Sequence, residues 1–235
     1  MTPTLPVSEV FGPVWQGEGP HTGRVCSFVR LGLCNLACEW CDTPYTWDHT
    51  RFDVHAQCPP RSPEWIESEL GGHGTDLLIL SGGEPLIHQA NPALAILLDS
   101  ITHEVHVETN GTLIPSEWLR HRVEHFTVSP KLPMAGAHGG RPALVGSSLT
   151  AWALLANQGR AAWKIVVSSL YDVKLATSLM DSHDVPARQR WLMPEGVTAD
   201  TILASARHLA PAILASGANL SLRQHCLLYG TERGR

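Results

Sequence analysis

The chain alternates short apolar segments with longer amphipathic ones, and this alternation constrains its fold more than any other feature. Strand candidates lie at 25–31, 77–80, 105–108, 126–129 and 163–167. Helix candidates lie at 64–70, 92–100 and 116–121, within 147–157, and at 171–180 and 199–215, and an apolar segment at 220–228 follows them. Strands that alternate with helices build a parallel sheet through right-handed crossovers. The sequence therefore predicts an α/β fold.

Length and composition narrow the classes of protein to consider. At 235 residues the chain is long enough for one sizeable domain, so we expect a single domain over 1–235. No apolar run approaches the roughly 18 residues of a membrane span, and the first residues do not resemble a secretory signal. We therefore expect no membrane segment and a cytoplasmic location. The net charge of -5 argues against direct binding to nucleic acid, which uses clustered Lys and Arg.

Polar or glycine-bearing segments follow several of the predicted strands. They lie at 81–84, 108–111 and 129–131, and a cysteine-rich loop follows the strand at 25–31. In α/β barrels the active site forms at the carboxyl edge of the strands. We therefore expect these segments to converge on one cleft.

Three cysteines, Cys34, Cys38 and Cys41, have a C-x3-C-x2-C spacing that brings three thiolates round one inorganic centre. A 4Fe-4S cluster normally takes four thiolates, so a set of three leaves one iron without a protein ligand. Such a vacancy is typical of catalytic rather than structural sites and favours a ligand from outside the protein. The other cysteines, Cys26 and Cys58 among them, fit small buried or loop residues better than ligands.

The alternative is a structural zinc site with His49 or Cys58 as its fourth ligand. Zinc fingers and ribbons usually pair their ligands as two short units separated by a longer loop. Here three ligands crowd together and no second pair follows. The spacing therefore favours the cluster.

With Trp40 before the third cysteine, the loop resembles the radical-SAM motif. The resemblance implies that the amine and carboxylate of S-adenosylmethionine (SAM) chelate the open iron. One electron then cleaves SAM to a 5'-deoxyadenosyl radical. Ser81-Gly-Gly-Glu-Pro85 resembles the second hallmark of these enzymes, in which glycines let the backbone approach SAM and Glu84 would meet its ammonium. The fold that this resemblance implies is a modified, incomplete (β/α) barrel.

The same resemblance implies a set of SAM-contacting residues along the chain. They are Trp40, Gly83, Glu84, Glu108, Asn110, Ser129, Pro130, Lys131, Met193, Pro194 and Glu195. Two alternatives stay open. Lys131 fits a solvated surface lysine too, and the pair Met193-Pro194 fits simple packing.

A longer resemblance narrows the family. The segment Ser8-Glu-Val-Phe-Gly-Pro-Val-Trp-Gln-Gly-Glu-Gly19, then 28–31 and 34–43, resembles the 7-carboxy-7-deazaguanine synthases of the queuosine and 7-deazapurine pathway. The likeness covers 8–131 and resumes at 191–196 and 222–230. It implies conversion of 6-carboxy-5,6,7,8-tetrahydropterin to 7-carboxy-7-deazaguanine with loss of ammonia, while SAM is regenerated.

Carried over by motif, Trp15, Gln16 and Gly17 would border the pterin. Arg30 would hold the substrate carboxylate through a charge-assisted pair, and Ser81 would donate a hydrogen bond to the substrate. An arginine in an apolar strand needs an anion in any case, so a structural partner is the alternative for Arg30.

The family also uses Mg2+, for which Thr43 is the candidate protein ligand, since magnesium takes much of its shell from water and substrate. A turn or helix cap is the alternative for Thr43. His225 fits a structural histidine better than a proton shuttle.

The resemblance further implies a homodimer and an electron donor such as flavodoxin or ferredoxin. Two other functions share part of the pattern. An activase that makes a glycyl radical on a partner protein has the same cysteine loop but would not need the 16–19 segment or Arg30. A zinc-stabilised binding module is the alternative from another class. The segments 44–63 and 135–140 match nothing in the family pattern, and Trp15 is bulkier than that pattern leads us to expect.

Overall fold

The structure is a computed structural model that describes residues 2–235. Within them nine strands form one sheet in the order β3-β1-β2-β4-β5-β6-β7-β8-β9. The strands are β1 (Leu5–Trp15), β2 (Val25–Leu31), β3 (Pro60–Arg61), β4 (Leu77–Gly82), β5 (Glu104–Thr109), β6 (His125–Val128), β7 (Ala161–Val167), β8 (Arg190–Pro194) and β9 (Asn219–Leu220). From β2 to β9 the neighbours run parallel. Because β3 and β9 do not pair, the sheet is an incomplete barrel.

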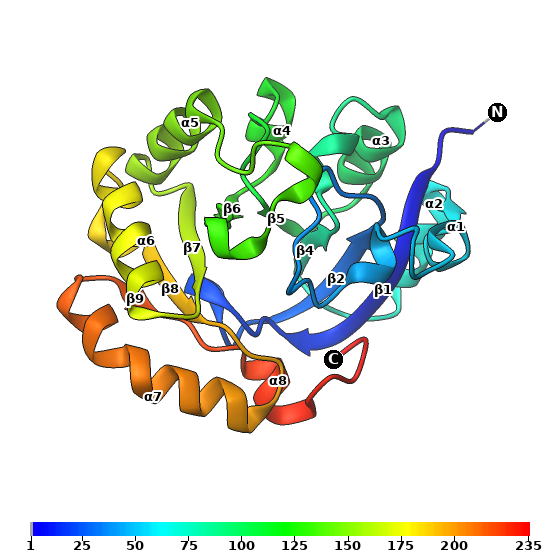
Figure 1. Cartoon of the computed structure of the whole chain (residues 1–235). Helices are drawn as coiled ribbons and strands as arrows, with labels where there is room; N and C mark the ends of the chain where they lie inside the picture. Colours follow the sequence, from blue (N-terminus) through cyan, green and yellow to red (C-terminus); the bar gives the residue numbers. More distant parts are fainter. Residues whose placement is uncertain (1) are drawn as a thin grey trace.

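Helices α3 to α7 lie on the outer side of the curved sheet, as Figure 1 shows. The helices of the described residues are α1 (Val54–Gln57), α2 (Pro63–Gly71), α3 (Pro92–Ser100), α4 (Glu117–Arg122), α5 (Gly146–Asn157), α6 (Leu170–Ser182), α7 (Ala199–Ala215) and α8 (Gln224–Tyr229). The predicted bounds of α3, α7 and β2 are confirmed, and the other predicted elements differ by no more than two residues at either end. No helix within the described residues is long and apolar enough to cross a membrane.

Small polar residues set the starts of the longer helices. The side chains of Ser62, Asn91, Ser169 and Thr198 each accept a backbone N–H from the first turn of α2, α3, α6 and α7 respectively. Such caps satisfy donors that have no partner inside the helix. The local sequence therefore fixes where the helices begin.

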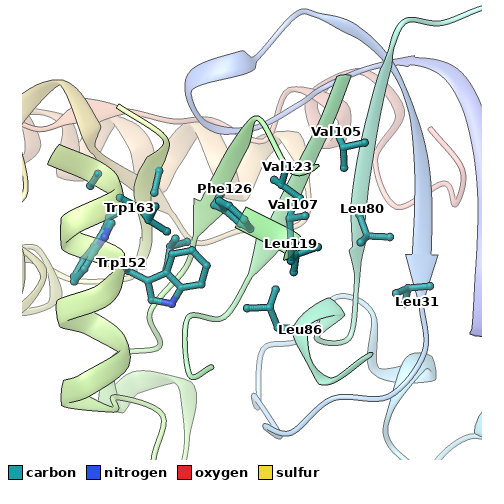
Figure 2. Packing of buried hydrophobic residues seen from close by; sticks show 14 of the residues in the cluster. Leu31, Leu80, Leu86, Val105, Val107, Leu119, Val123, Phe126, Trp152 and Trp163 are labelled. Carbon is teal, nitrogen blue, oxygen red and sulfur yellow. The ribbon is translucent and has the colours of Figure 1, made fainter. Parts of the chain in front are cut away.

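The main apolar core fills the space between the sheet and the outer helices, as Figure 2 shows. Phe126 of β6 packs against Trp152 of α5, with ring centroids 5.2 Å apart. Buried Trp152 also donates a hydrogen bond from Nε1 to the carbonyl of Gly111 at 3.1 Å. The core thus holds the loop that follows β5 in place.

The long strand β1 was not predicted. It pairs antiparallel with β2, and its register shifts between Val7 and Glu9 and between Phe11 and Val14. Its sequence contains Pro6 and the pair Gly12-Pro13, which interrupt a regular strand pattern. Pairing with β2 rather than local propensity therefore makes this segment a strand.

The C-terminal part of the chain also differs from a simple apolar segment. Strand β8 was not predicted, and the segment 220–228 separates into the end of β9 and most of α8. Between these two elements the chain turns inward, where Ser221 and Arg223 are buried. This short turn carries polar residues toward the concave side of the sheet.

Three histidine rings pack together toward the amino-terminal ends of β5 and β6. The ring centroid of His21, in the short 3-10 helix η1 (Gly19–His21), lies 4.3 Å from His106 and 4.5 Å from His125. Burial lowers the pKa of His125 to about 3 and that of His21 to about 4, and it also lowers the pKa of His106. All three rings are therefore neutral near pH 7. His106 and His125 precede Glu108 and Thr127 by two residues, so each pair shares one face of the sheet.

This histidine cluster is expected to make folding stability depend on pH. Histidine in an unfolded chain has a pKa of about 6.5, so below this pH the unfolded state binds protons that the folded state does not. The contribution of these neutral histidines to the free energy of unfolding is therefore fully present above about pH 6.5 and is lost as the pH falls below it. Between pH 7.5 and 5.5, one such histidine lowers the free energy of unfolding by about 1.4 kcal/mol. The His125→Phe variant should therefore lose about that much less stability than the wild type over this range.

Urea unfolding at these two pH values measures the effect as a difference between wild type and variant. His208→Ala is the control, because His208 is exposed on α7 and contacts none of the three rings. Its pH dependence should match that of the wild type. An unchanged pH dependence in His125→Phe would contradict the assignment.

Candidate active site

A pocket lies at the carboxyl ends of the parallel strands and is lined by residues of β1, β2 and β4 to β8 and of the loops that follow them. The sequence-predicted site residues that line it are Trp15, Gln16, Gly17, Arg30, Cys34, Cys38, Trp40, Cys41, Thr43, Ser81, Gly83, Glu108, Asn110, Ser129, Lys131, Met193 and Glu195. Glu84, Pro130 and Pro194 are buried and do not line it. The polar segments therefore converge on one cleft as expected, whereas the role of each residue remains a prediction.

The loop after β2 carries the three cysteines, and all three line this pocket. The backbone N–H of Leu36 donates to Cys34 Sγ at 3.4 Å, and Trp47 Nε1 donates to Cys41 Sγ at 3.3 Å. Burial raises the pKa of the Cys34 thiol to about 12. A thiolate at this position is costly unless a metal shares its charge, which suits a metal-binding loop.

The cysteines fit a 4Fe-4S cluster better than a single zinc ion. A cluster binds each thiolate to a different iron, whereas zinc draws its sulfur ligands to about 2.3 Å from one point. The fourth ligands that the zinc alternative requires, His49 and Cys58, do not line the pocket. Cys58 is instead buried against Gly32.

Glu84 is fully buried and does not reach the pocket. Its Oε1 accepts from Thr109 Oγ1 at 2.7 Å and from the Leu86 N–H at 3.0 Å. Its Oε2 accepts from the Asn110 N–H at 2.6 Å. Burial raises the pKa of this carboxyl, and the hydrogen bonds oppose the rise. Both oxygens accept hydrogen bonds within the protein, so Glu84 ties the loop after β4 to the loop after β5, and its contact with the SAM ammonium stays a prediction.

Glu108 connects the predicted substrate residues to the predicted SAM residues. Gln16 Nε2 donates to its Oε1 at 3.1 Å, and Ser81 Oγ donates to its Oε2 at 2.8 Å. Asn110, two residues further on, uses its amide within the protein, since Nδ2 donates to Asn35 Oδ1 at 2.8 Å. The two predicted subsites therefore share a wall.

Lys131 points into the pocket rather than into bulk solvent. Its Nζ donates to Ser129 Oγ at 2.8 Å and lies 5.4 Å from the ring centroid of Trp40. An ammonium at this distance from an aromatic face is attracted by its quadrupole. Lys131 therefore presents its charge beside the cysteine loop.

Arg30 has an anionic partner that the sequence analysis did not identify. Its Nε donates to Glu9 Oε2 at 2.7 Å across the β1–β2 pair. Tyr45 Oη and Arg233 Nε also donate to Glu9, at 3.3 and 2.8 Å. Glu9 therefore supplies the anion that a half-buried arginine requires. Arg30 still lines the pocket.

The charged pocket residues that were missed include Glu18, Lys164 and Arg223. Lys164 Nζ is paired with Glu18 Oε2, and Arg223 Nε donates to Glu18 Oε1 at 3.0 Å. Burial alone would raise the pKa of Glu18, but the two cations and His225 outweigh it and lower that pKa. A signal was present for Lys164, which is the one charged residue in the apolar strand β7.

Comparisons with known proteins agree with this geometry. The model of the Radical SAM superfamily matches residues 29–130. A protein of Pyrobaculum aerophilum named 7-carboxy-7-deazaguanine synthase is 31% identical over 236 residues, covering 100% of this chain and 99% of that protein. One of Hyperthermus butylicus with the same name is 32% identical, with 95% and 92% covered.

The chain belongs to the 7-carboxy-7-deazaguanine synthase family.

Solved structures support the assignment of the chain to this family. The crystal structure of QueE from Escherichia coli has a TM-score of 0.67 and 26% identity, and the match covers 94% of this chain and 95% of that one. SuiB from Streptococcus suis, with a TM-score of 0.53 and 11% identity, shares the fold over 81% of this chain and 46% of its own. The incomplete barrel predicted for the synthase family is therefore confirmed. Membership of the Radical SAM superfamily implies a 4Fe-4S cluster and SAM.

Proposed function

We infer that the chain converts 6-carboxy-5,6,7,8-tetrahydropterin to 7-carboxy-7-deazaguanine with release of ammonia, using SAM catalytically. One observation carries this inference: the 16–18 segment, Arg30 and the three cysteines line a single pocket. The full-length relatives named above support it. A glycyl-radical activase would not need the first two of these features. Neither alternative from the sequence analysis is favoured by an observation of its own.

On the substrate side, Arg30 holds the pterin carboxylate through its Nη groups, because its Nε is engaged by Glu9. A planar guanidinium suits such a pair. Gln16 and Ser81, both held by Glu108, present polar atoms to the ring. Trp15, which is 47% exposed, and Gly17 border the mouth of the pocket.

On the cofactor side, the cysteine loop holds the cluster, and the residues proposed to contact SAM are Trp40, Gly83, Glu108, Asn110, Ser129, Lys131, Met193 and Glu195. When bound, cluster and SAM supply one-electron chemistry that removes a hydrogen atom from the substrate. The chain's own contribution is to place the two molecules in contact and to exclude water. Lys131 is suited to meet the SAM carboxylate or ribose hydroxyls, because its ammonium faces the pocket beside Trp40.

We also propose that Thr43 is the protein ligand of a Mg2+ ion. Thr43 precedes the short 3-10 helix η2 (Pro44–Thr46), but its side chain makes no capping hydrogen bond. The hydroxyl lies 3.6 Å from Cys41 Sγ in the pocket wall and is free of the capping role considered above. A single hydroxyl suits magnesium, which keeps several waters and binds substrate oxygens.

The direct test is an anaerobic assay of the reconstituted chain with the tetrahydropterin, SAM, Mg2+ and a reductant. The expected result is 7-carboxy-7-deazaguanine in excess of the SAM consumed. A reconstituted protein that cleaves SAM but forms no product from this pterin would overturn the proposal. Assays with and without Mg2+ test the magnesium assignment separately, since Thr43→Ala should raise the Mg2+ concentration that gives half-maximal activity.

Arg30→Ala is expected to weaken the substrate far more than SAM. Hydrogen bonds to charged groups contribute about 1.5–3 kcal/mol, so the KM for the pterin should rise about 10- to 100-fold. The Kd of SAM should change by less than about threefold, because Arg30 is proposed to contact only the pterin. Arg30→Lys keeps the charge and should recover part of the loss. Equal losses for pterin and SAM would count against the assignment.

We further propose a single domain over 1–235, which the continuous nine-stranded sheet supports. A homodimer, a flavodoxin or ferredoxin as electron donor and a cytoplasmic location remain predictions from the family resemblance. Sedimentation of the reconstituted chain and reduction by each donor test the first two of these.

A further inference from the structure

Arg223 joins three loops that reach the pocket from different parts of the chain. Its Nε donates to Glu18 Oε1 at 3.0 Å and its Nη1 to the carbonyl of Gly196 at 2.9 Å, while its Nη2 is paired with Asp42 Oδ2. The residue is 8% exposed. Each of the three guanidinium nitrogens therefore has a partner within the protein.

Each of these three partners directly adjoins a predicted ligand-binding residue. Asp42 follows Cys41 of the cysteine loop, Glu18 follows Gly17 of the proposed pterin-binding segment, and Gly196 follows Glu195 of the proposed SAM-binding loop. A rigid planar fork fixes the relative positions of its acceptors better than a flexible ammonium does. Arg223 thus links the cluster, the SAM site and the substrate site.

The segment that carries Arg223 is itself docked on the N-terminal loop. The Gln224 N–H donates to the Gly17 carbonyl at 2.9 Å, and the Gly19 N–H donates to Ser221 Oγ at 2.8 Å. A Cβ on Gly17 would collide with the ring of His225. These contacts on both sides of Arg223 indicate a fixed joint rather than a mobile surface arginine.

The charges around this joint balance. Lys164 Nζ is paired with the other oxygen of Glu18, so two carboxylates, Glu18 and Asp42, meet two cations. The Asp42 side chain is 44% exposed, so it can turn to solvent once its partner is removed. Removing Arg223 should therefore release the cysteine loop and the N-terminal loop from each other, while Lys164 still holds Glu18.

We propose that Arg223 is a positioning residue that holds the cluster, SAM and the substrate in register, so that SAM cleavage is coupled to hydrogen abstraction from the substrate. The proposal rests on the proposed function. Reacting atoms must lie about 3–3.5 Å apart, and a misplacement of about 1 Å costs about 100-fold in rate. A released loop therefore favours uncoupled cleavage, in which SAM, one electron from the reductant and one hydrogen atom from the surroundings give methionine and 5'-deoxyadenosine.

The test measures product formed per 5'-deoxyadenosine released by the reconstituted full chain, with dithionite as reductant. Arg223→Gln should lower this ratio at least about tenfold relative to the wild type, with iron and sulfide content unchanged. Arg223→Lys should give an intermediate ratio, because one ammonium cannot hold all three acceptors. Asp42→Asn, which weakens only the link to the cysteine loop, should also lower the ratio.

Arg190→Gln is the matched control. Arg190 is also largely buried and paired, to Asp181 and the Val185 carbonyl, but it lies outside the pocket. Its ratio should equal that of the wild type even if its stability falls.

The outcomes separate this inference from the proposed function. A wild-type chain that makes no product from the pterin defeats the proposed function. Product formation that slows in the Arg223 and Asp42 variants with an unchanged ratio defeats the positioning role alone. If Arg223→Gln fails to fold, Asp42→Asn decides by the same ratio.

Discussion

Replacing Cys38 with alanine is expected to remove the cluster and the enzymatic activity together. Three thiolates are the whole of the protein's ligand set in the pocket, and each binds one iron, so two remaining thiolates do not hold a stable 4Fe-4S cluster. Activity should fall below detection, because every turnover begins at the cluster. Iron and labile sulfide content, visible absorbance and product formation, all after the same anaerobic reconstitution, measure the two losses.

Cys58→Ala is the matched control for this experiment. Cys58 is buried and packs against Gly32 outside the pocket, so its loss should lower stability slightly and leave iron content and activity at wild-type levels. The zinc alternative with Cys58 as its fourth ligand predicts instead that Cys58→Ala also loses its metal. Full activity in Cys38→Ala, or stoichiometric zinc without labile sulfide in the wild type, would refute the cluster.

Local sequence patterns were sufficient for the parallel strands β2 and β4 to β7, but not for β8. Buried parallel strands are continuous apolar runs, and capped amphipathic helices have clear starts, so the bounds of α7 follow from Thr198 and the apolar period. They were insufficient for β1. Its residues include Pro6 and Gly12-Pro13, and the strand exists because β2 offers it an antiparallel partner. Pairing between distant segments is not encoded in a local period.

For the site too, local patterns predicted which motif residues line the pocket but not the contacts between distant segments. Residues inside a motif or directly after a strand, such as Cys34, Ser81 and Glu108, were placed in the pocket because the carboxyl ends of parallel strands meet at one edge. The ion pairs of Glu18 with Lys164 and Arg223 join residues 146 and 205 positions apart, and no spacing rule finds such pairs.

The burial of the Glu84 side chain also depends on contacts between segments that are distant in the sequence. It depends on donors from the next loop, Thr109 and Asn110. Motif reasoning therefore identifies which loops meet, whereas the contacts between loops have to come from the structure.

Gly83→Ala is expected to be among the most damaging single-methyl changes in the site. A Cβ at Gly83 would collide with the carbonyl oxygen of Leu33 and would lie 2.6 Å from its carbonyl carbon and 3.1 Å from Cys34 Cβ. These are mostly backbone atoms, and they are fixed from both sides, since the Gly83 N–H donates to the Leu31 carbonyl and the Glu84 N–H to that of Leu33, each at 2.9 Å. The cysteine loop must therefore shift.

Overpacking of this kind costs about 1–3 kcal/mol of stability, and a shift of about 1 Å at Cys34 costs about 100-fold in rate. Thermal unfolding and turnover of the anaerobically reconstituted variant measure both. Gly71→Ala adds the same methyl group in α2, where a Cβ would meet no atom within 4 Å. That control should keep wild-type activity and gain helix propensity. Equal activity of Gly83→Ala and Gly71→Ala would contradict this prediction. It would mean that the cysteine loop can move away from β4 without loss of function, so the contact between these two loops would not fix the positions of the cluster and SAM.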